Sequence, residues 1–480
     1  MQKKFITNLA LLLLLNLLIK PFWILGIDRA VQNAVSPVDY GLFYALFNFS
    51  FLFNILLDFG ITNFNNKNIA QNNHLLSKHL SGIVILRILL AVIYLVITLL
   101  TGYIIGYNNY QLKLLLVMAF NQFLASFILY LRSNLAGLHL FKTDSIISVL
   151  DRLIMIGICS LLLWGGITNQ NNPFKIEWYI YSQSIAYVIS VIITIFIVFD
   201  KARLKKLKWN TTFFIMILKK SYPYAILVLL MTFYNRIDAV MLERMLEDGK
   251  EQSSIYASAY RLLDAANMIA YLFAGLLLPI FARMIKLKHN IEDLVRLSFS
   301  ILFMLSVSAA IFSVNFNEEI MALLYQNHIQ ESAKVFSLLM CCFVFVATTY
   351  VFGTLLTANG NLKILNYMAA GGMILNILLN IILIPHYKAM GSATSSLITQ
   401  GATALFQVIV ALKLFKFKIN FKYLAAIATF AIVCSVTVYY IKSVIHNLYI
   451  TFLICLLTFT TYALLLRIIN FKSLKKEFSV

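Results

Sequence analysis

The stretch LALLLLLNLLIKPFWILGIDRAVQNA, residues 9–34, is long and apolar, yet charged residues interrupt it. A helix of this length can cross the roughly 30 Å apolar core of a bilayer. Lys20 lies about 16 Å along it from Leu9, near the midplane, and Pro21 removes a backbone donor and bends the helix there. A lysine at that depth costs on the order of 3 kcal/mol. We therefore expect Lys20 to line a watery cavity or to pair with an acid on another helix.

The composition is that of an integral membrane protein. Hydrophobic residues make up 61% of the chain and charged residues 12%, and the mean hydropathy is +0.85. A soluble domain carries about twice that share of charge. The five cysteines lie in apolar runs without metal-ligand spacing, and the seven histidines fall in or beside polar connections. We therefore expect no metal, no cofactor and no histidine proton relay.

Apolar segments long enough to span a bilayer recur along the whole chain, and we count fourteen. The predicted fold is thus an all-α polytopic membrane protein. The first six spans are Leu9–Ala34, Val38–Phe64, Leu80–Ile105, Leu112–Leu138, Ser145–Gly166 and Trp178–Phe199. The other eight are Phe213–Leu242, Ser254–Ala282, Leu294–Val314, Ala333–Ala358, Ile364–Ile384, Ser392–Leu414, Tyr423–Ile441 and Leu448–Ile469.

Lysine and arginine are concentrated in every second connection between these spans, most densely in residues 200–212 and again in the tail. Because cytoplasmic loops carry the excess of basic residues, this pattern places both termini in the cytoplasm. The intervening connections are poor in lysine and contain several acids. The net charge of +20 therefore reflects topology and does not indicate a nucleic-acid partner.

The lysine-rich connection divides the chain. It predicts an N-terminal six-helix lobe over residues 1–199, a basic cytoplasmic linker over 200–212 and a C-terminal six-helix lobe over 213–414. Two further helices and a basic cytoplasmic tail occupy residues 415–480. The similar stretches DYGLFYAL (39–46) and IYASAYRL (255–262) lie six spans apart and predict pseudo-two-fold symmetry between the lobes. Such repeats place a binding site between the two halves.

Charged side chains inside the spans are the candidate functional residues. Basic residues in a cavity suit an anionic ligand, because arginine binds phosphate through two N–H groups and lysine acts as a point charge. The candidate substrate-binding residues are Lys20, Arg29, Arg132, Arg236 and Arg261. The candidate gating or ion-pairing residues are Asp28, Asp58, Arg87, Asp151, Arg152, Asp238 and Asp264.

These charges fall into two tiers that would suit gates opening alternately. Asp58, Arg87, Arg132, Asp151 and Arg152 lie in the predicted cytoplasmic third, and all the others except Lys20 lie in the outer half. For the cytoplasmic tier, snorkelling to the interface or local pairing explains the charges equally well. Arg261 and Asp264 are three residues apart on one helix face, where they can pair with each other or with the first lobe.

Several short motifs, in this order, resemble a known family. They are LGIDR (25–29) and YGLF (40–43), Leu278-Pro279 with Arg283, and TANG (357–360) followed by Leu375-Asn376, Asn380, Ile384-Pro385 and Gly391-Ser392-Ala393. Together they resemble the oligosaccharide (O-antigen/polysaccharide) flippase branch of the multidrug/oligosaccharidyl-lipid/polysaccharide exporter superfamily.

The resemblance implies a fourteen-helix, two-lobed transporter that moves an undecaprenyl-diphosphate-linked oligosaccharide across a bacterial cytoplasmic membrane by alternating access. Lys20, Asp28-Arg29 and Arg261 stand where related lipid II flippases have cavity-lining residues, although here lysine replaces arginine and the acid–base order is reversed. The resemblance further implies a transporter rather than an enzyme, expected as a monomer. Its partners would be the lipid-linked substrate, membrane lipids and a glycan polymerase or other assembly proteins.

Three alternatives remain at this point. A cation-coupled multidrug exporter of the same superfamily would need acids for a cationic substrate, whereas the midplane charge here is Lys20. A membrane enzyme, such as a glycan polymerase or ligase, typically needs a sizeable outer loop, which this chain lacks. A scaffold for surface-glycan assembly is the third.

Overall fold

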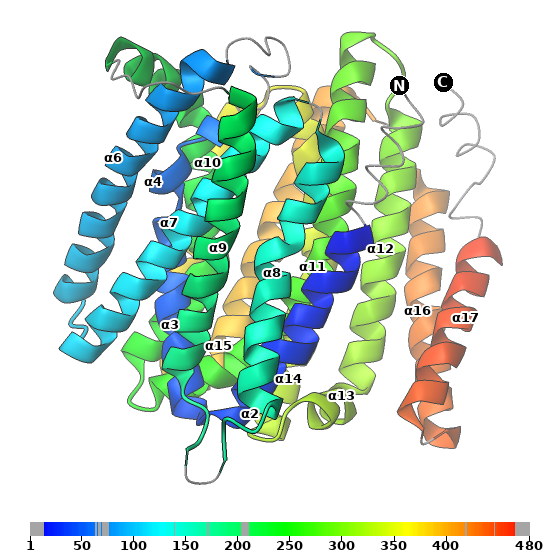
Figure 1. The fold of residues 1–480 in the computed structure, drawn as a ribbon. Helices are drawn as coiled ribbons and strands as arrows, with labels where there is room; N and C mark the ends of the chain where they lie inside the picture. Colours follow the sequence, from blue (N-terminus) through cyan, green and yellow to red (C-terminus); the bar gives the residue numbers. More distant parts are fainter. Residues whose placement is uncertain are drawn as a thin grey trace. The chain divides into compact units, whose positions relative to one another are not determined.

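The computed structural model describes residues 14–62, 65, 69, 76–138, 140–169, 172–202, 211–417, 420–445 and 447–465. Within these residues the regular structure is helical, apart from one isolated β-bridge between Asn169 and Asn172. The chain divides into two compact units, Met1–Ser254 and Ile255–Val480. Figure 1 shows the helices of both units, coloured from blue to red along the chain.

The chain is an all-α, multi-pass membrane protein, as the sequence predicts. Ten of the described helices are long and apolar enough to cross a membrane. Helices suit that environment because their backbone N–H and C=O groups are paired within the element, where lipid offers no partners. Each of the fourteen expected segments contains helical residues in the described part of the chain. Fourteen crossings and the pseudo-two-fold symmetry stay predictions.

The first unit begins with a helix over residues 14–34. Two residues after Pro21 it widens into the π-helical turn η1 (Trp23–Asp28) and then continues as α2 (Arg29–Ala34). After it come α3 (Pro37–Leu52), α4 (Ile55–Asp58), α6 (Leu76–Ile104), α7 (Asn109–Gly137), α8 (Phe141–Trp164), α9 (Ile176–Ala202) and α10 (Thr211–Met245). The start of α3 is set by Pro37 in its first turn and by the Ser36 side chain, which accepts a hydrogen bond from the backbone N–H of Asp39.

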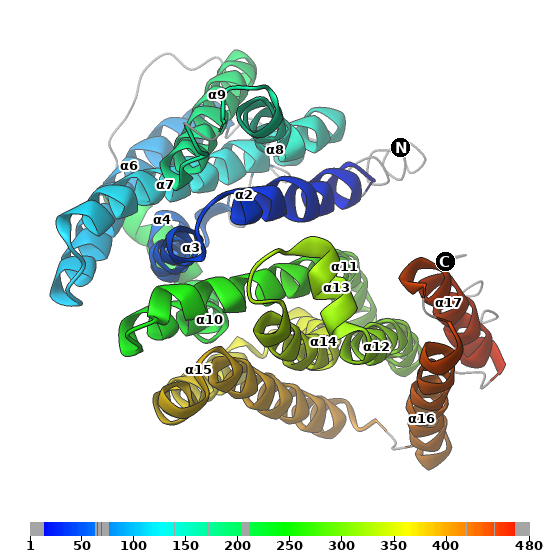
Figure 2. The ribbon, with the colours of Figure 1, turned by 90° about the horizontal axis from the view of Figure 1, so that it is seen from below.

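Side chains from α6, α7, α9 and α10, with Ile61, Ile69 and Ile147, form the main apolar core of this unit. The helix α7 packs against α9, α6 and α3, while α10 packs along α3 (Figure 2). The helix α8 packs against α9 on one side and against η1 and α2 on another. This arrangement brings charged residues of the first helix, α7 and α8 to one place.

The second unit contains most of α11 (Gly249–Lys286), followed by α12 (Glu292–Asn315), α13 (Asn317–Leu324), α14 (Ile329–Ala358), α15 (Leu362–Phe415), α16 (Phe421–Val444) and α17 (Leu448–Leu465). The long α15 comprises two helices joined at Lys388, whose φ of 51° and ψ of −131° are not helical. It therefore covers two of the expected spans. The last two helices, α16 and α17, both pack against α12 (Figure 2).

The boundary between the compact units falls inside α11, so α10 belongs to the first unit. The sequence places the division one helix earlier, at residues 200–212, of which 203–210 lie outside the described residues. The basic tail from residue 466 onward lies outside them too. The lobes over 1–199 and 213–414 stay predictions.

Candidate functional site

Charged side chains of the first unit gather around α8. We define the cationic cluster as Lys20, Arg132, Asp144, Asp151 and Arg152, of which the last three lie on α8 and Arg132 on α7. Lys20 is half-buried and lies within electrostatic reach of Arg152, Arg132 and Asp151. The structure thus brings Lys20 near three predicted site residues, Arg132, Asp151 and Arg152, that are far from it in the sequence.

A buried polar contact sets the register between the first helix and α8. The side-chain amide of Asn16 donates to the hydroxyl of Ser148 at 3.0 Å, and that hydroxyl donates in turn to the carbonyl of Ser145 at 2.7 Å. Lys20 follows Asn16 by four residues, as Arg152 follows Ser148, and residues four apart lie on the same helix face. The contact therefore places Lys20 one turn further on, beside the acid–base pair of α8.

Arg132 is paired with Asp144 across the short turn between α7 and α8. Its Nε donates to Oδ1 at 2.7 Å and its Nη2 to Oδ2 at 3.4 Å. The sequence prediction missed Asp144 because it starts the fifth span at Ser145, whereas α8 begins at Phe141. The signal was the spacing, because Arg132 lies six residues before the short turn 138–140 and Asp144 four residues after it, so the two can meet across it.

Arg152 lies midway along α8, with 11 helical residues (141–151) before it and 12 (153–164) after it. The depth of Arg152 in the membrane stays a prediction. The guanidinium carbon lies 5.4 Å from the ring centroid of Trp23 and 5.8 Å from that of Tyr187. We call Trp23 and Tyr187 the aromatic clamp. The sequence analysis did not single these rings out among the many aromatic residues.

Asp28 is buried at the end of the π-helical turn and is held by two tyrosines. Its carboxylate accepts hydrogen bonds from the hydroxyls of Tyr40 at 2.8 Å and Tyr179 at 2.5 Å. The ring of Tyr179 also stacks on Trp23, with centroids 5.7 Å apart and planes 3° apart. Arg29 follows, half-buried, and its Nε is buried without a hydrogen-bond partner among the described residues.

Asp58 and Arg87 form an ion pair that links α4 to α6. Arg87 is 1% exposed, and it also donates to the hydroxyl of Thr62 and to the backbone carbonyl of Ser126. Its guanidinium carbon lies 4.8 Å from the ring centroid of Tyr130 on α7. This set of partners connects three helices.

The remaining candidates lie on α10 and α11. The guanidinium carbon of Arg236 is 5.5 Å from the ring centroid of Phe51, and Asp238 is buried. Both lie on α10 in the first unit, whereas Arg261 and Asp264 are half-buried, one turn apart, on the part of α11 that belongs to the second unit. Substrate-binding and gating roles for these residues stay predictions.

The first unit is closely packed where α3 meets the start of α11. Gly41 lies so near it that an added Cβ would sit 1.7 Å from the backbone oxygen of Lys250. Close by in the sequence, the amide of Gln32 donates to the carbonyl of Ser254 at 3.1 Å. No side chain larger than hydrogen fits at position 41 unless the start of α11 moves.

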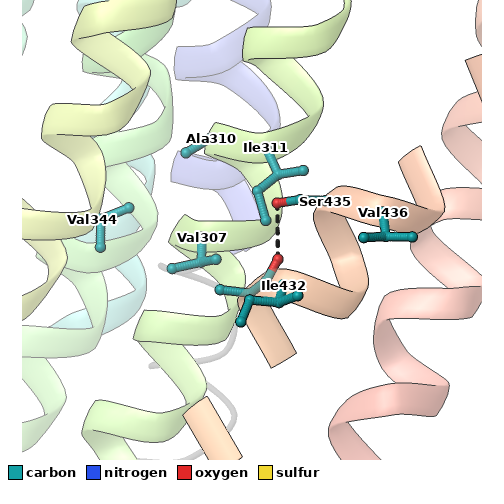
Figure 3. Close-up of a pocket in the computed structure, with 8 residues that line it drawn as sticks. Val307, Ala310, Ile311, Val344, Ile432, Ser435 and Val436 are labelled. Carbon is teal, nitrogen blue, oxygen red and sulfur yellow. Dashed lines mark hydrogen bonds between the residues drawn. The ribbon is translucent and has the colours of Figure 1, made fainter. Parts of the chain in front are cut away.

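The second unit has an apolar groove of about 360 Å³ between α12, α14 and α16, lined by Val307, Ala310, Ile311, Val344, Ala431, Ile432, Ser435 and Val436 (Figure 3). Its one polar side chain, Ser435, donates its hydroxyl to the carbonyl of Ala431 at 2.9 Å. The groove offers nothing to neutralise a charged ligand. The described residues contain no group of His, Cys, Asp and Glu that could hold a metal ion.

Comparisons with known proteins agree with this architecture. The family described as "Polysaccharide biosynthesis protein" matches residues 6–285. A search of curated proteins finds no match. The family match agrees with the resemblance that the sequence motifs carry.

Solved structures share the fold. An inward closed conformation of the lipid II flippase MurJ is similar with a TM-score of 0.69 and 16% identity, covering 92% of this chain and 96% of that one. An inward-facing multidrug resistance MATE family transporter of the MOP superfamily gives 0.64 and 14%, covering 83% and 96%. A MOP superfamily transporter from Pyrococcus furiosus gives 0.57 and 14%, covering 85% and 93%.

Proposed function

Because the chain belongs to the polysaccharide biosynthesis protein family, we propose that it is a flippase for an undecaprenyl-diphosphate-linked oligosaccharide. It would move this lipid from the inner to the outer leaflet of a bacterial cytoplasmic membrane, with both of its own termini in the cytoplasm. It would act as a monomer, and a glycan polymerase or another assembly protein would receive the product. The chemistry is transport, so no bond is made or broken.

The cationic cluster is the observation that carries this proposal. Lys20, Arg132 and Arg152 bring three positive charges against two negative ones on Asp144 and Asp151, which leaves one positive charge. A diphosphate crossing the apolar core needs such groups in place of its lost hydration. A cationic drug would find an excess of like charge here, which makes the cluster unfavourable for a cation-coupled drug exporter.

Alternating access is part of this proposal, and the close packing of Gly41 and Gln32 against the start of α11 is a contact that would change during it. For transport the start of α11 would have to move away from Gly41 of α3.

The test is flipping by purified protein in vesicles. A short fluorescent sugar on undecaprenyl diphosphate is placed in both leaflets, and an impermeant quencher reports the fraction that reaches the outer leaflet. Protein-containing vesicles should expose more substrate with time than protein-free ones. Lys20→Glu should stop this movement and Lys20→Arg should keep part of it, because only the latter retains the positive charge.

Two results would count against the proposal. One is transport of a lipophilic cation without any movement of the lipid-linked sugar. The other is full activity of Lys20→Leu, which would show that the charge at this position serves packing alone.

A further inference from the structure

Arg152 is held firmly, but its hydrogen-bond donors are mostly unused. Among the described residues its Nη2 donates to the hydroxyl of Tyr187 at 3.2 Å, and its Nη1 reaches only the thioether sulfur of Met155 at 3.6 Å. Its Nε lies 3.6 Å from a carboxylate oxygen of Asp151, beyond normal hydrogen-bond length. Thioether sulfur is a weak acceptor, so Nη1 and Nε both lack a strong partner.

Two other paired arginines of the first unit differ from it. Arg132 presents Nε and Nη2 to the single carboxylate of Asp144, with the shorter bond at 2.7 Å. Arg87 donates from Nη1 to Ser126 and from Nη2 to Asp58 and Thr62, while its Nε is buried without a partner among the described residues. Each of the two has a carboxylate acceptor within hydrogen-bond length, whereas Arg152 has none among the described residues, so its guanidinium can take up an oxyanion.

The aromatic clamp fixes the orientation of the Arg152 guanidinium. Both ring centroids lie within the roughly 6 Å at which a cation interacts with a ring face. Trp23 is itself immobilised, because Tyr179 stacks on it and it is buried. A guanidinium that is already oriented loses little freedom when a ligand binds, which favours affinity.

The charge nearby suits a diphosphate. Lys20, within electrostatic reach of Arg152, supplies a point charge on a flexible stem, and Arg152 supplies a planar fork. The fork matches two oxygens of one phosphate and the ammonium can follow the other.

Resting on the proposed function, we propose that Arg152 binds the phosphate oxygens of the lipid-linked substrate through the Nη1 edge of its guanidinium. Trp23 is the positioning residue that holds its guanidinium in place. This gives Arg152 a substrate-binding role, in addition to its contact with Asp151. It also gives the Trp23 ring a function beyond core filling.

The test measures binding of farnesyl diphosphate to detergent-purified full-length protein by calorimetry. Trp23→Leu should weaken binding about tenfold, the size of effect expected for a desolvated cation–aromatic contact. Trp23→Phe should restore most of the affinity, because it keeps an aromatic face. Trp178→Leu is the matched control: Trp178 contacts Phe174 edge to face, and its replacement should leave the affinity unchanged.

A second variant covers the case in which Trp23→Leu does not yield monodisperse protein. Arg152→Lys keeps the charge and loses the fork, so it should bind farnesyl diphosphate more weakly and discriminate less against farnesyl monophosphate. Wild-type affinity in Arg152→Lys or in folded Trp23→Leu overturns the inference, as does a wild-type protein that binds no farnesyl diphosphate. The vesicle assay is independent, so these failures would leave the proposed flipping activity to stand or fall by itself.

Discussion

Arg87 lies between α4, α6 and α7 with 1% of its surface exposed. A charge in that position is stable only because Asp58 neutralises it and because Ser126 and Thr62 accept its hydrogen bonds. Removing one member of such a pair costs about 3–5 kcal/mol, since the partner is left buried and uncompensated. Replacing both members with apolar groups costs far less.

We therefore expect Arg87→Leu to lower the free energy of unfolding by about 3–5 kcal/mol. Adding Asp58→Leu to it should recover part of that loss. Unfolding by SDS in mixed micelles measures both variants. Additive losses in the double variant would show that the two side chains do not depend on each other.

At this scale the sequence predicted which charges lie inside the protein but not their partners. Lys20, Arg87 and Arg152 stand out because charge in an apolar run is costly. Their partners were unpredictable in two ways. Asp144 lies in a segment that the sequence assigns to a loop, and Trp23 and Tyr187 belong to a residue class too common in membrane helices to be singled out.

Among the elements, α3 shows how closely two segments can approach. Gly41 faces the start of α11, where an added Cβ would overlap the Lys250 carbonyl oxygen and lie 2.9 Å from the Ser254 nitrogen. Both of these are backbone atoms, so neither can rotate away. The first turn of α11, which carries Lys250, would have to move as a whole.

Gly41→Ala should therefore separate α3 from this turn. A cysteine pair at Gln32 and Ser254, whose side chains are in contact, should cross-link readily in the wild-type background and slowly beside Gly41→Ala. Gly157→Ala in α8 is the control, because nothing lies within 4 Å of its added Cβ and alanine favours helix. Equal cross-linking in the two variants would contradict this packing argument.

Helices were the most predictable elements, because an apolar run of bilayer length can pair its backbone N–H and C=O groups within lipid only as a helix or in a closed barrel. Their interruptions were harder to predict. Phe59 and Gly60 after α4 have φ values of 48° and 78°, and they interrupt a stretch that the sequence predicts as one span, Val38–Phe64. Lys388 inside α15, with a φ of 51°, lies in the connection expected between the spans Ile364–Ile384 and Ser392–Leu414, although lysine seldom adopts such an angle. The Pro21 bend was predicted, but not its π-helical form.

For the whole molecule, the distribution of basic residues predicts the orientation that transport depends on. Cysteines placed at Asn169 and Glu247 should react with an impermeant reagent added outside, whereas one placed at Lys363 should not. Asn169 and Glu247 are exposed and lie in connections poor in lysine, whereas Lys363 lies near one of the connections in which lysine and arginine are concentrated. Labelling in the opposite sense would reverse the proposed direction of transport.

The direction also has an energetic consequence. A diphosphate-linked substrate carries about two negative charges, and each charge crossing about 100 mV gains on the order of 2.3 kcal/mol. Outward movement from a negative cytoplasm could thus gain roughly 4–5 kcal/mol if both charges cross the full field. The cationic cluster would then only have to lower the barrier by replacing lost hydration.

We expect flipping in vesicles to accelerate when potassium and valinomycin hold the cytoplasmic side of the protein negative. A rate that ignores voltage and follows a proton or sodium gradient would instead indicate ion-coupled exchange.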